Sequence, residues 1–185
     1  MNPRTAGALI LAALAGGVAF GPLGAAPDKV PANLCEIDEQ PVFACKAGRS
    51  LASICVGREH ATYRYGLPGS PSLAVTSTAD WSNVHLGGVV GQGGGHQTHV
   101  RFTTGLIHYT VYAGLNGRLT DDPGRSYAGI DVSQGKGGET AIAAIPCDAG
   151  FWTSADWTER LRAAAPLRFR DALDETTDGP FDAWF

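Results

Sequence analysis

The sequence HVRFTTGLIHYTVY, residues 99–112, decides the fold class. Apolar and polar residues alternate on both sides of Thr104-Gly105, and a period of two is typical of a half-buried β-strand. A glycine in a two-residue turn can take the positive φ that a tight hairpin requires. We therefore predict an antiparallel hairpin in which Phe102 faces Ile107 and the apolar side chains share one face.

Further strands are predicted on both sides of this hairpin. Segments rich in β-branched and aromatic residues alternate with turn signals, which is the all-β pattern. These segments lie at 43–45, 51–55, 61–65, 72–76, 81–90, 127–132 and 140–145. The predicted fold is mainly β, with about eight short antiparallel strands in a small sandwich or barrel.

Composition limits the size and the class of the protein. The chain has 185 residues, of which 44% are hydrophobic and 17% charged. These values indicate one globular domain rather than a disordered chain. The net charge of −4, from 14 basic and 18 acidic residues, argues against a nucleic-acid-binding protein.

The N-terminus has the three-part layout of a secretory signal peptide. Arg4 is the single charge before the apolar run of Ala8–Phe20, and small residues follow this run. The run of about 13 residues is shorter than the ~20 that a membrane-spanning helix needs. We predict a signal peptide over residues 1–26, cleaved between about 19 and 26. We expect a periplasmic or secreted bacterial protein with no transmembrane span after cleavage.

Four cysteines lie after this leader, where export would allow disulfides to form. Three pairings are possible. If 43–45 and 51–55 form a hairpin, Cys45 lies near its turn and Cys55 near the segment that holds Cys35. This favours a Cys35–Cys55 bond and a Cys45–Cys147 bond. Zinc binding is disfavoured because the 10-residue intervals differ from the paired spacing of zinc sites.

The composition changes after residue 147, so we divide the mature chain into a β-rich domain, 27–147, and a tail, 148–185. The tail is acidic and holds three of the four tryptophans. A helix is predicted over 154–165, capped by Thr153 or Ser154, and a second short helix through 167–174. This tail is the expected C-terminal helical extension of the β domain.

Several motifs occur in an order that resembles a known group of proteins. They are Phe43-Ala44-Cys45, Ser53-Ile54-Cys55, Tyr63-Arg64-Tyr65-Gly66, Phe102, Tyr109-Thr110-Val111-Tyr112, Gly129-Ile130-Asp131-Val132 and Ile145-Pro146-Cys147. Over residues 35–147 this layout resembles small exported bacterial proteins with no assigned activity. The resemblance implies export and a disulfide-bearing β-rich domain, and it implies no catalytic residues.

Four histidines are candidates for a zinc or copper site: His85, His96, His99 and His108. The predicted register places His108 opposite Arg101, whose positive charge would oppose a metal cation. A spacing of three puts His96 and His99 on opposite faces of a strand. We therefore interpret these histidines as exposed polar residues, and we predict no metal, no cofactor and no catalytic residue.

Other motifs have simpler interpretations. Gly91–Gly95 is read as a flexible loop, since no helix start or Lys follows to form a phosphate site. Ser133–Lys136 matches S-x-x-K within a Gly-rich turn, where Lys is too hydrated to act as a base. Asp121–Gly124 is read as a turn that lacks the pattern of a calcium loop. The strand aromatics are read as packing rather than as a ligand platform: Tyr63, Tyr65, Phe102, Tyr109 and Tyr112.

These observations favour a non-enzymatic binding module whose partner is an envelope component or a foreign protein. A His-dependent metal-binding hydrolase is the first alternative. An outer-membrane β protein is the second, because the chain ends on the apolar alternation of 181–185. Pro180 interrupts that alternation, so we interpret it as an aromatic tail that docks onto the domain.

Overall fold

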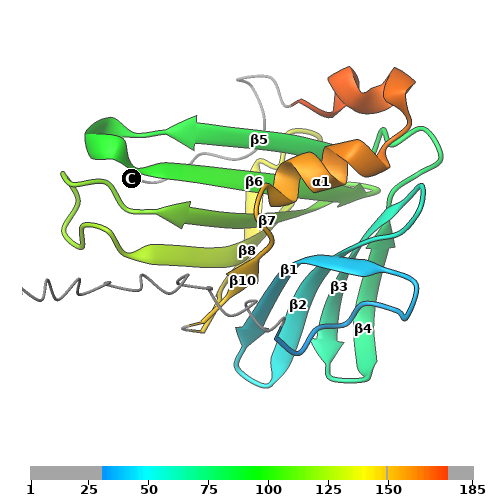
Figure 1. The fold of residues 1–185 in the computed structure, drawn as a ribbon, viewed down its shortest axis with the longest axis horizontal. Coiled ribbons are helices and arrows are strands. Elements are labelled where there is room, and N and C mark those ends of the chain that lie inside the picture. The colour runs from blue at the N-terminus through cyan, green and yellow to red at the C-terminus, as the bar shows by residue number, and fades with distance from the viewer. Residues whose placement is uncertain (1–30, 149, 175–185) are drawn as a thin grey trace, which may run out of the picture.

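The computed structural model describes residues 31–148 and 150–174 (Figure 1). Within these residues, ten strands form two antiparallel sheets of five strands each. The predicted mainly β, disulfide-stapled fold with a helical extension is confirmed, and the two separate sheets make it a sandwich. The predicted signal peptide and the segment 181–185 lie outside the described residues.

Each sheet is a meander, and a segment from the C-terminal part joins the first of them. Sheet A has the order β10-β1-β2-β3-β4, and sheet B has the order β5-β6-β7-β8-β9. The strands of sheet A are β1 (Gln40–Ala47), β2 (Ser50–Val56), β3 (Ala61–Leu67), β4 (Ser70–Thr76) and β10 (Trp152–Thr153). Those of sheet B are β5 (Val84–Val90), β6 (His96–Thr104), β7 (Ile107–Leu115), β8 (Ser126–Gln134) and β9 (Thr140–Pro146).

The hairpin that decides the fold forms, but the predicted register is wrong by two residues. Phe102 lies opposite Tyr109 rather than Ile107, and Thr104 lies opposite Ile107. The turn is centred one residue later than predicted because Gly105, with φ 59°, takes its first position. A shift of two residues keeps every side chain on its predicted face, so the apolar face is preserved.

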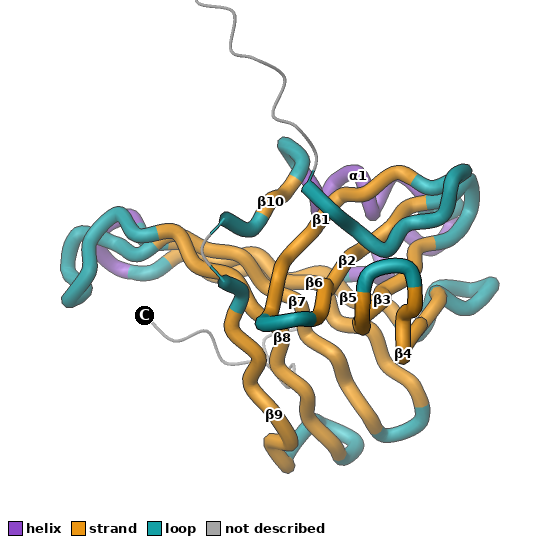
Figure 2. The backbone as a smooth tube through the Cα atoms, turned by 90° about the horizontal axis from the view of Figure 1, so that it is seen from below, coloured by secondary structure: helices purple, strands orange, loops and turns teal. Residues whose placement is uncertain are grey.

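The core lies between the inner faces of the two sheets, whose strands Figure 2 draws in orange. Tyr63 of sheet A is buried against sheet B, with its ring centroid 6.1 Å from that of Phe102 and 5.6 Å from that of Tyr109. Burial raises the pKa of the Tyr63 hydroxyl. These aromatic side chains form core packing, as predicted, and not a ligand platform.

A short turn that leads from sheet A to sheet B is anchored by Trp81. This residue has φ 58°, which is rare for a bulky side chain, and its indole is buried in the core. The backbone N–H of Trp81 donates to the carbonyl of Thr78 at 2.9 Å, and the backbone carbonyl of Trp81 accepts from the N–H of Val84 at 3.1 Å. Hydrogen bonds from Thr78 and Ser82 lower the pKa of Asp80 to about 2. Burial of the indole offsets the backbone strain and fixes where the chain changes sheets.

The first described residues run across the outer face of sheet A. The Cys35–Cys55 disulfide attaches this segment to β2, as predicted. The backbone N–H of Leu34 donates to Ser53 Oγ at 3.0 Å. The segment therefore covers a sheet face that would otherwise be open to water.

A buried ion pair holds the same segment. Arg64 on β3 donates to both carboxylate oxygens of Glu39, with an Nη2 to Oε1 distance of 3.1 Å. It also donates to Glu36 at 2.9 Å. Burial alone would raise the pKa of Glu39, but hydrogen bonds from Arg64 and from the backbone N–H of Glu36 outweigh it and hold this pKa below its usual value. Arg64 and Glu39 are both almost fully buried, so the charged form of each side chain is stabilised by the charge of the other.

We expect Glu39→Gln to lower the free energy of unfolding by about 2 kcal/mol at pH 7. A carboxyl whose pKa is lowered by folding stabilises the fold above its unfolded-state pKa, and this contribution is lost as the pH falls through the folded-state pKa. The difference between the variant and the original protein should therefore shrink on acidification. Urea unfolding between pH 7 and pH 3 measures it.

The matched control is Glu36→Gln, since Glu36 bonds the same guanidinium but has 69% of its side chain exposed. It should cost about 0.5 kcal/mol or less. Equal losses for the two variants would contradict the assignment of Glu39 as the essential partner of Arg64.

The second disulfide brings the C-terminal part back to sheet A. Cys45 on β1 is bonded to Cys147, which directly follows β9, as predicted. Beyond it lie β10, the helix α1 (Trp157–Ala164) and the 3₁₀ helix η2 (Leu167–Leu173). In the described residues no helix has the length and apolarity to cross a bilayer.

The predicted start and cap of the first helix are wrong. The helix begins at Trp157 rather than at 154, and Asp156, with φ 54°, precedes it without a side-chain cap bond. The reason is that Ser154 continues the pairing of β10, with its N–H donating to the Val42 carbonyl at 2.9 Å. The second predicted short helix is present as η2.

Loss of the Cys45–Cys147 bond should destabilise the protein more than loss of Cys35–Cys55. The bonds close loops with sequence separations of 102 and 20 residues. In the chain-entropy account, loops of about 100 and about 15 residues give about 4.7 and 3 kcal/mol. Urea unfolding of the double variants Cys45→Ser/Cys147→Ser and Cys35→Ser/Cys55→Ser tests this order, and the reverse order would contradict it.

Candidate binding groove

A hollow in the described part of the chain lies where sheet B extends past sheet A. Figure 1 shows β5–β8 projecting beyond sheet A toward the turn that joins β5 to β6 and the loop that joins β7 to β8. The hollow has a volume of about 510 Å³ and is bounded on its other side by residues 151–158. We call it the groove.

The floor of the groove is a continuation of the core face of sheet B. His96 and Thr98 on β6 alternate in phase with the buried Val100, so all three point to the same side. Thr98 lies opposite Ala113 on β7, and because both side chains are small they leave the space above the sheet open. Leu115 and Ser126 complete the floor toward the open end.

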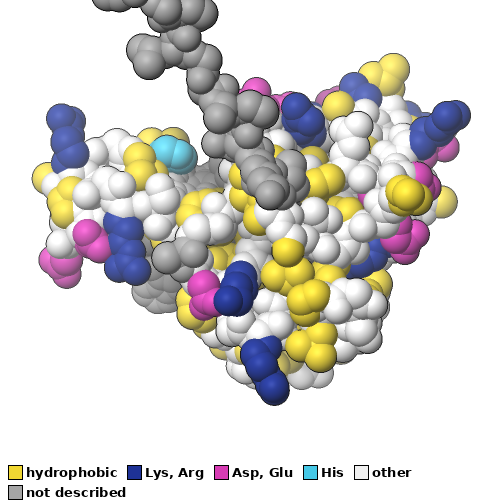
Figure 3. All heavy atoms as spheres, turned by 60° about the horizontal axis from the view of Figure 1, so that its bottom comes forward, with side chains coloured by type: hydrophobic (Ala, Val, Ile, Leu, Met, Phe, Trp, Pro, Cys, Tyr) yellow, Lys and Arg dark blue, Asp and Glu magenta, His cyan; other side chains and the backbone are white. Residues whose placement is uncertain are grey.

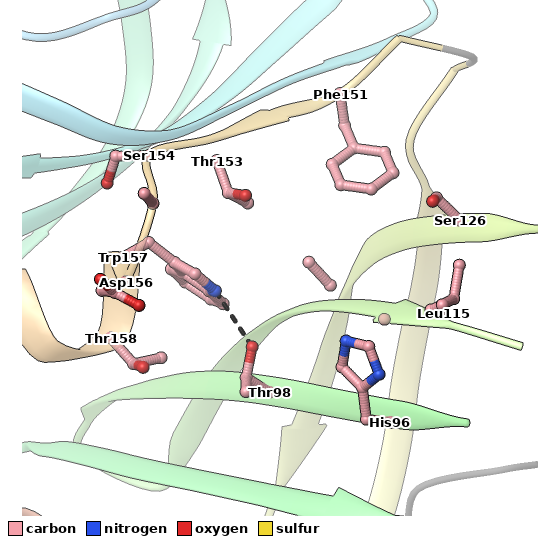
Figure 4. A pocket seen from close by; sticks show the side chains of 13 residues that line it. His96, Thr98, Leu115, Ser126, Phe151, Thr153, Ser154, Asp156, Trp157 and Thr158 are labelled. Carbon is pink, nitrogen blue, oxygen red and sulfur yellow. Dashed lines mark hydrogen bonds between the residues drawn. The ribbon is translucent and has the colours of Figure 1, made fainter. Parts of the chain in front are cut away.

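Trp157, at the start of α1, closes the inner end of the groove. Its indole Nε1 donates to Thr98 Oγ1 at 3.0 Å (Figure 4). The same ring has its centroid 5.6 Å from that of Phe43 in sheet A. Trp157 therefore contacts both sheets and fixes α1 across the angle between them.

The middle of the groove is open and has an amphipathic lining. In Figure 4, Phe151 and Trp157 stand on one side of the space and His96 on the other. Ser154 lines this groove and also a second hollow of about 380 Å³ on the other side of β10. Its Oγ is buried and has no hydrogen-bond partner among the described residues. Such a lining can hold an apolar side chain of a ligand and can form hydrogen bonds with the backbone of a bound peptide.

β10 presents a free edge at this site. It is the terminal strand of sheet A and pairs with β1 at Phe43–Thr153 and Ala44–Trp152. No other described strand lies beside it. An open strand edge is a template for backbone pairing with another extended segment.

The four candidate histidines are divided between the two faces of sheet B. His96 is exposed and lines the groove, whereas His99 points to the opposite face, as the spacing of three predicted. None of the four belongs to a group of metal-ligating side chains in the described residues. The one group with suitable distances is Cys35, Glu39 and Cys55, in which both sulfurs are already bonded to each other.

The prediction that these histidines are exposed is wrong for His99 and His108, which are both buried. The register shift places His108 opposite Thr103 instead of Arg101. His108 Nε2 donates to the Gly135 carbonyl at 2.7 Å, and Nδ1 lies 3.0 Å from Thr103 Oγ1. Both ring nitrogens are therefore used within the fold.

The remaining motifs have structural roles. The Gly91–Gly95 segment holds the one-turn 3₁₀ helix η1 (Gln92–Gly94) and leads into the strand β6, so it does not open an α-helix as a phosphate loop does. It is tied to the next loop, since Arg118 N–H donates to the Gly93 carbonyl at 3.0 Å. Lys136 is exposed and Asp122 pairs with Arg125 at 3.1 Å, both in turns, as predicted.

Comparison of the chain with protein-family models, with curated proteins and with solved structures found no match. The candidate site therefore depends on the geometry of this chain. The sequence did not indicate the groove, because its wall and floor lie far apart along the chain. The available signal was the abundance of tryptophan after Cys147.

Thr98→Val should lower the free energy of unfolding by about 1 to 3 kcal/mol, because it leaves the buried Trp157 N–H without an acceptor. Thr98→Ser, which keeps the hydroxyl, is the control and should cost less. Thermal unfolding followed by tryptophan fluorescence measures both. Equal costs would show that the hydroxyl does not hold Trp157 in place.

Proposed function

We propose that this protein is an exported, non-enzymatic binding module that takes an extended polypeptide segment in the groove. The free edge of β10 beside the open floor of sheet B is the observation that carries the proposal. A bound segment would pair its backbone with β10 and place one apolar side chain between Phe151 and the floor.

The arrangement of the candidate catalytic side chains, inside and outside the groove, supports binding over catalysis. A nucleophile needs a base within hydrogen-bond reach, and Ser154 Oγ has no such partner among the described residues. His108 has both nitrogens engaged, and Lys136 is exposed to water. The lining combines the aromatic side chains of Phe151 and Trp157 with several hydroxyl groups, and such a mixture suits recognition of a polypeptide segment.

The disulfides and the surface charge bear on the compartment and the partner. Two disulfides fit an oxidising compartment, and with the predicted leader they support a periplasmic or secreted bacterial protein, like the group that the motifs resemble. On the face shown in Figure 3, Lys and Arg side chains lie apart and form no continuous basic patch. We infer that the partner is an envelope component or a foreign protein that offers an extended segment, and not a nucleic acid.

Selection of the purified, oxidised protein against a library of random displayed peptides tests this function. We expect enriched sequences with an aromatic or branched apolar residue and no proline in the pairing segment. Ser126→Phe, which fills the open end of the groove, should weaken binding of a selected synthetic peptide about tenfold or more. Titration calorimetry measures the affinity.

The matched control is Thr140→Phe, which adds the same ring at an exposed position on β9, outside the groove. It should leave the affinity within about twofold of the original. Failure to enrich any peptide, or equal binding by both variants, would reject the groove as a peptide site.

A further inference from the structure

The face of sheet B that points away from the core is polar across four strands. Its members are His85 on β5, Gln97, His99 and Arg101 on β6, Thr110 and Tyr112 on β7, and Asp131 on β8. The pairing places His85, Arg101, Thr110 and Asp131 in one row across the strands. We call this surface the polar face.

Three of the seven members of the polar face are buried and the other four are half-buried, although no described helix or strand lies over this face. Gln97, His99 and Thr110 are 3%, 4% and 3% exposed. Sheet A, α1 and η2 lie on the other face or at the β5 edge (Figures 1 and 2). Long side chains on an uncovered sheet face would be largely accessible to water. A cover from outside residues 31–148 and 150–174 would account for this burial.

Two pKa shifts agree with a covered surface. Burial raises the pKa of Asp131, and burial together with the charge of Asp131 raises the pKa of Tyr112 to about 12. Both shifts disfavour the ionised forms, as expected where water is excluded. The Tyr112 ring also packs against Tyr127, with centroids 6.2 Å apart, and so offers an aromatic surface beside the polar groups.

We propose that residues 175–185 of this same chain cover the polar face. The last described residue, Asp174, forms a parallel bridge with Leu86 on the edge strand β5. Leu86 is the sequence neighbour of His85, so the chain reaches the border of the polar face at this point. The N-terminal end of the described chain lies on the outer face of sheet A, on the opposite side of the sandwich from the polar face. There the backbone N–H of Leu34 is hydrogen-bonded to Ser53 Oγ.

The composition of the segment complements that of the face. Residues 175–185 contain Glu175, Asp178 and Asp182 and no Lys or Arg. The polar face carries the guanidinium of Arg101 and the imidazoles of His85 and His99, against the single carboxyl of Asp131. Acidic groups that meet a basic surface favour the complex electrostatically. Phe181, Trp184 and Phe185 would supply the apolar area that excludes water.

The segment is also long enough. The distance from β5 to β8 spans three strand spacings, which is about 14 Å at about 4.8 Å each. The 11 residues of 175–185 can extend over about 36 Å. The segment therefore reaches every member of the polar face without displacing η2.

Histidine modification by diethylpyrocarbonate, mapped by mass spectrometry, tests this proposal. In the full chain, His96 should react and His99 should be protected. In a chain that ends at Asp174, His99 should react about tenfold faster. A tenfold change in rate corresponds to a free energy of about 1.4 kcal/mol for docking of the cover. His96 lies on the other face of the same strand and is the internal control, so its rate should not change.

Addition of a synthetic peptide of residues 175–185 to the shortened chain should restore protection of His99. A peptide with its three acidic residues replaced by Asn or Gln should not. If the shortened chain fails to fold, the full-length double variant Asp182→Asn/Trp184→Ala replaces it, with the same expectation for His99. Unchanged protection of His99 would overturn the proposal, and so would protection that depends on protein concentration, which would assign the cover to a second copy.

Discussion

The Cys45–Cys147 bond determines how the C-terminal part meets the two sheets. It joins β1 of sheet A to the end of β9 in sheet B, so that the residues after Cys147 must leave between the sheets. Backbone bonds continue the constraint, from Asp148 N–H to the Lys46 carbonyl at 2.6 Å and from Ser154 N–H to the Val42 carbonyl. β10 is short because the chain then has to turn away from β1 into α1. The placement of Trp157, and with it the inner end of the groove, follows from this covalent link.

The groove lies where β6, β7 and β8 run past the β10 side of sheet A (Figure 1). The strands of sheet A run across those of sheet B in this view, so one end of β6–β8 projects beyond sheet A. An inner face that the sandwich would cover elsewhere is therefore open at His96 and Thr98. Small and polar residues at these positions are compatible with water, whereas Val100 and Phe102 further along β6 are not.

The sequence predicted what depends on local pattern and missed what depends on long-range contact. Strands and turns were found from alternation and from glycine. The pairing of Cys35 with Cys55 followed from the positions of Cys45 and Cys55 on one hairpin, since Cys55 lies at the end near the segment that holds Cys35. The register at Gly105 was wrong, because either of two adjacent dipeptides can form the turn and tertiary packing chooses between them. Burial of His99 and His108 could not be read from the sequence, since the solvation of a polar strand face depends on contacts with residues that are distant in sequence. The groove was missed because residues 151–158, which form its wall, are held beside sheet B by the long-range Cys45–Cys147 bond.

One strand, β6, serves both surfaces of sheet B. Its even-numbered residues run from the groove into the core, from His96 to Phe102, and its odd-numbered residues form part of the polar face. A slip of one residue would place Arg101 in the core and Phe102 on the polar face, so the register is specified by both surfaces at once. This explains how a strand with two histidines and an arginine can lie second from the edge of a sheet. His99 and Arg101 lie on one face and the buried Val100 and Phe102 on the other, because side chains alternate along a strand.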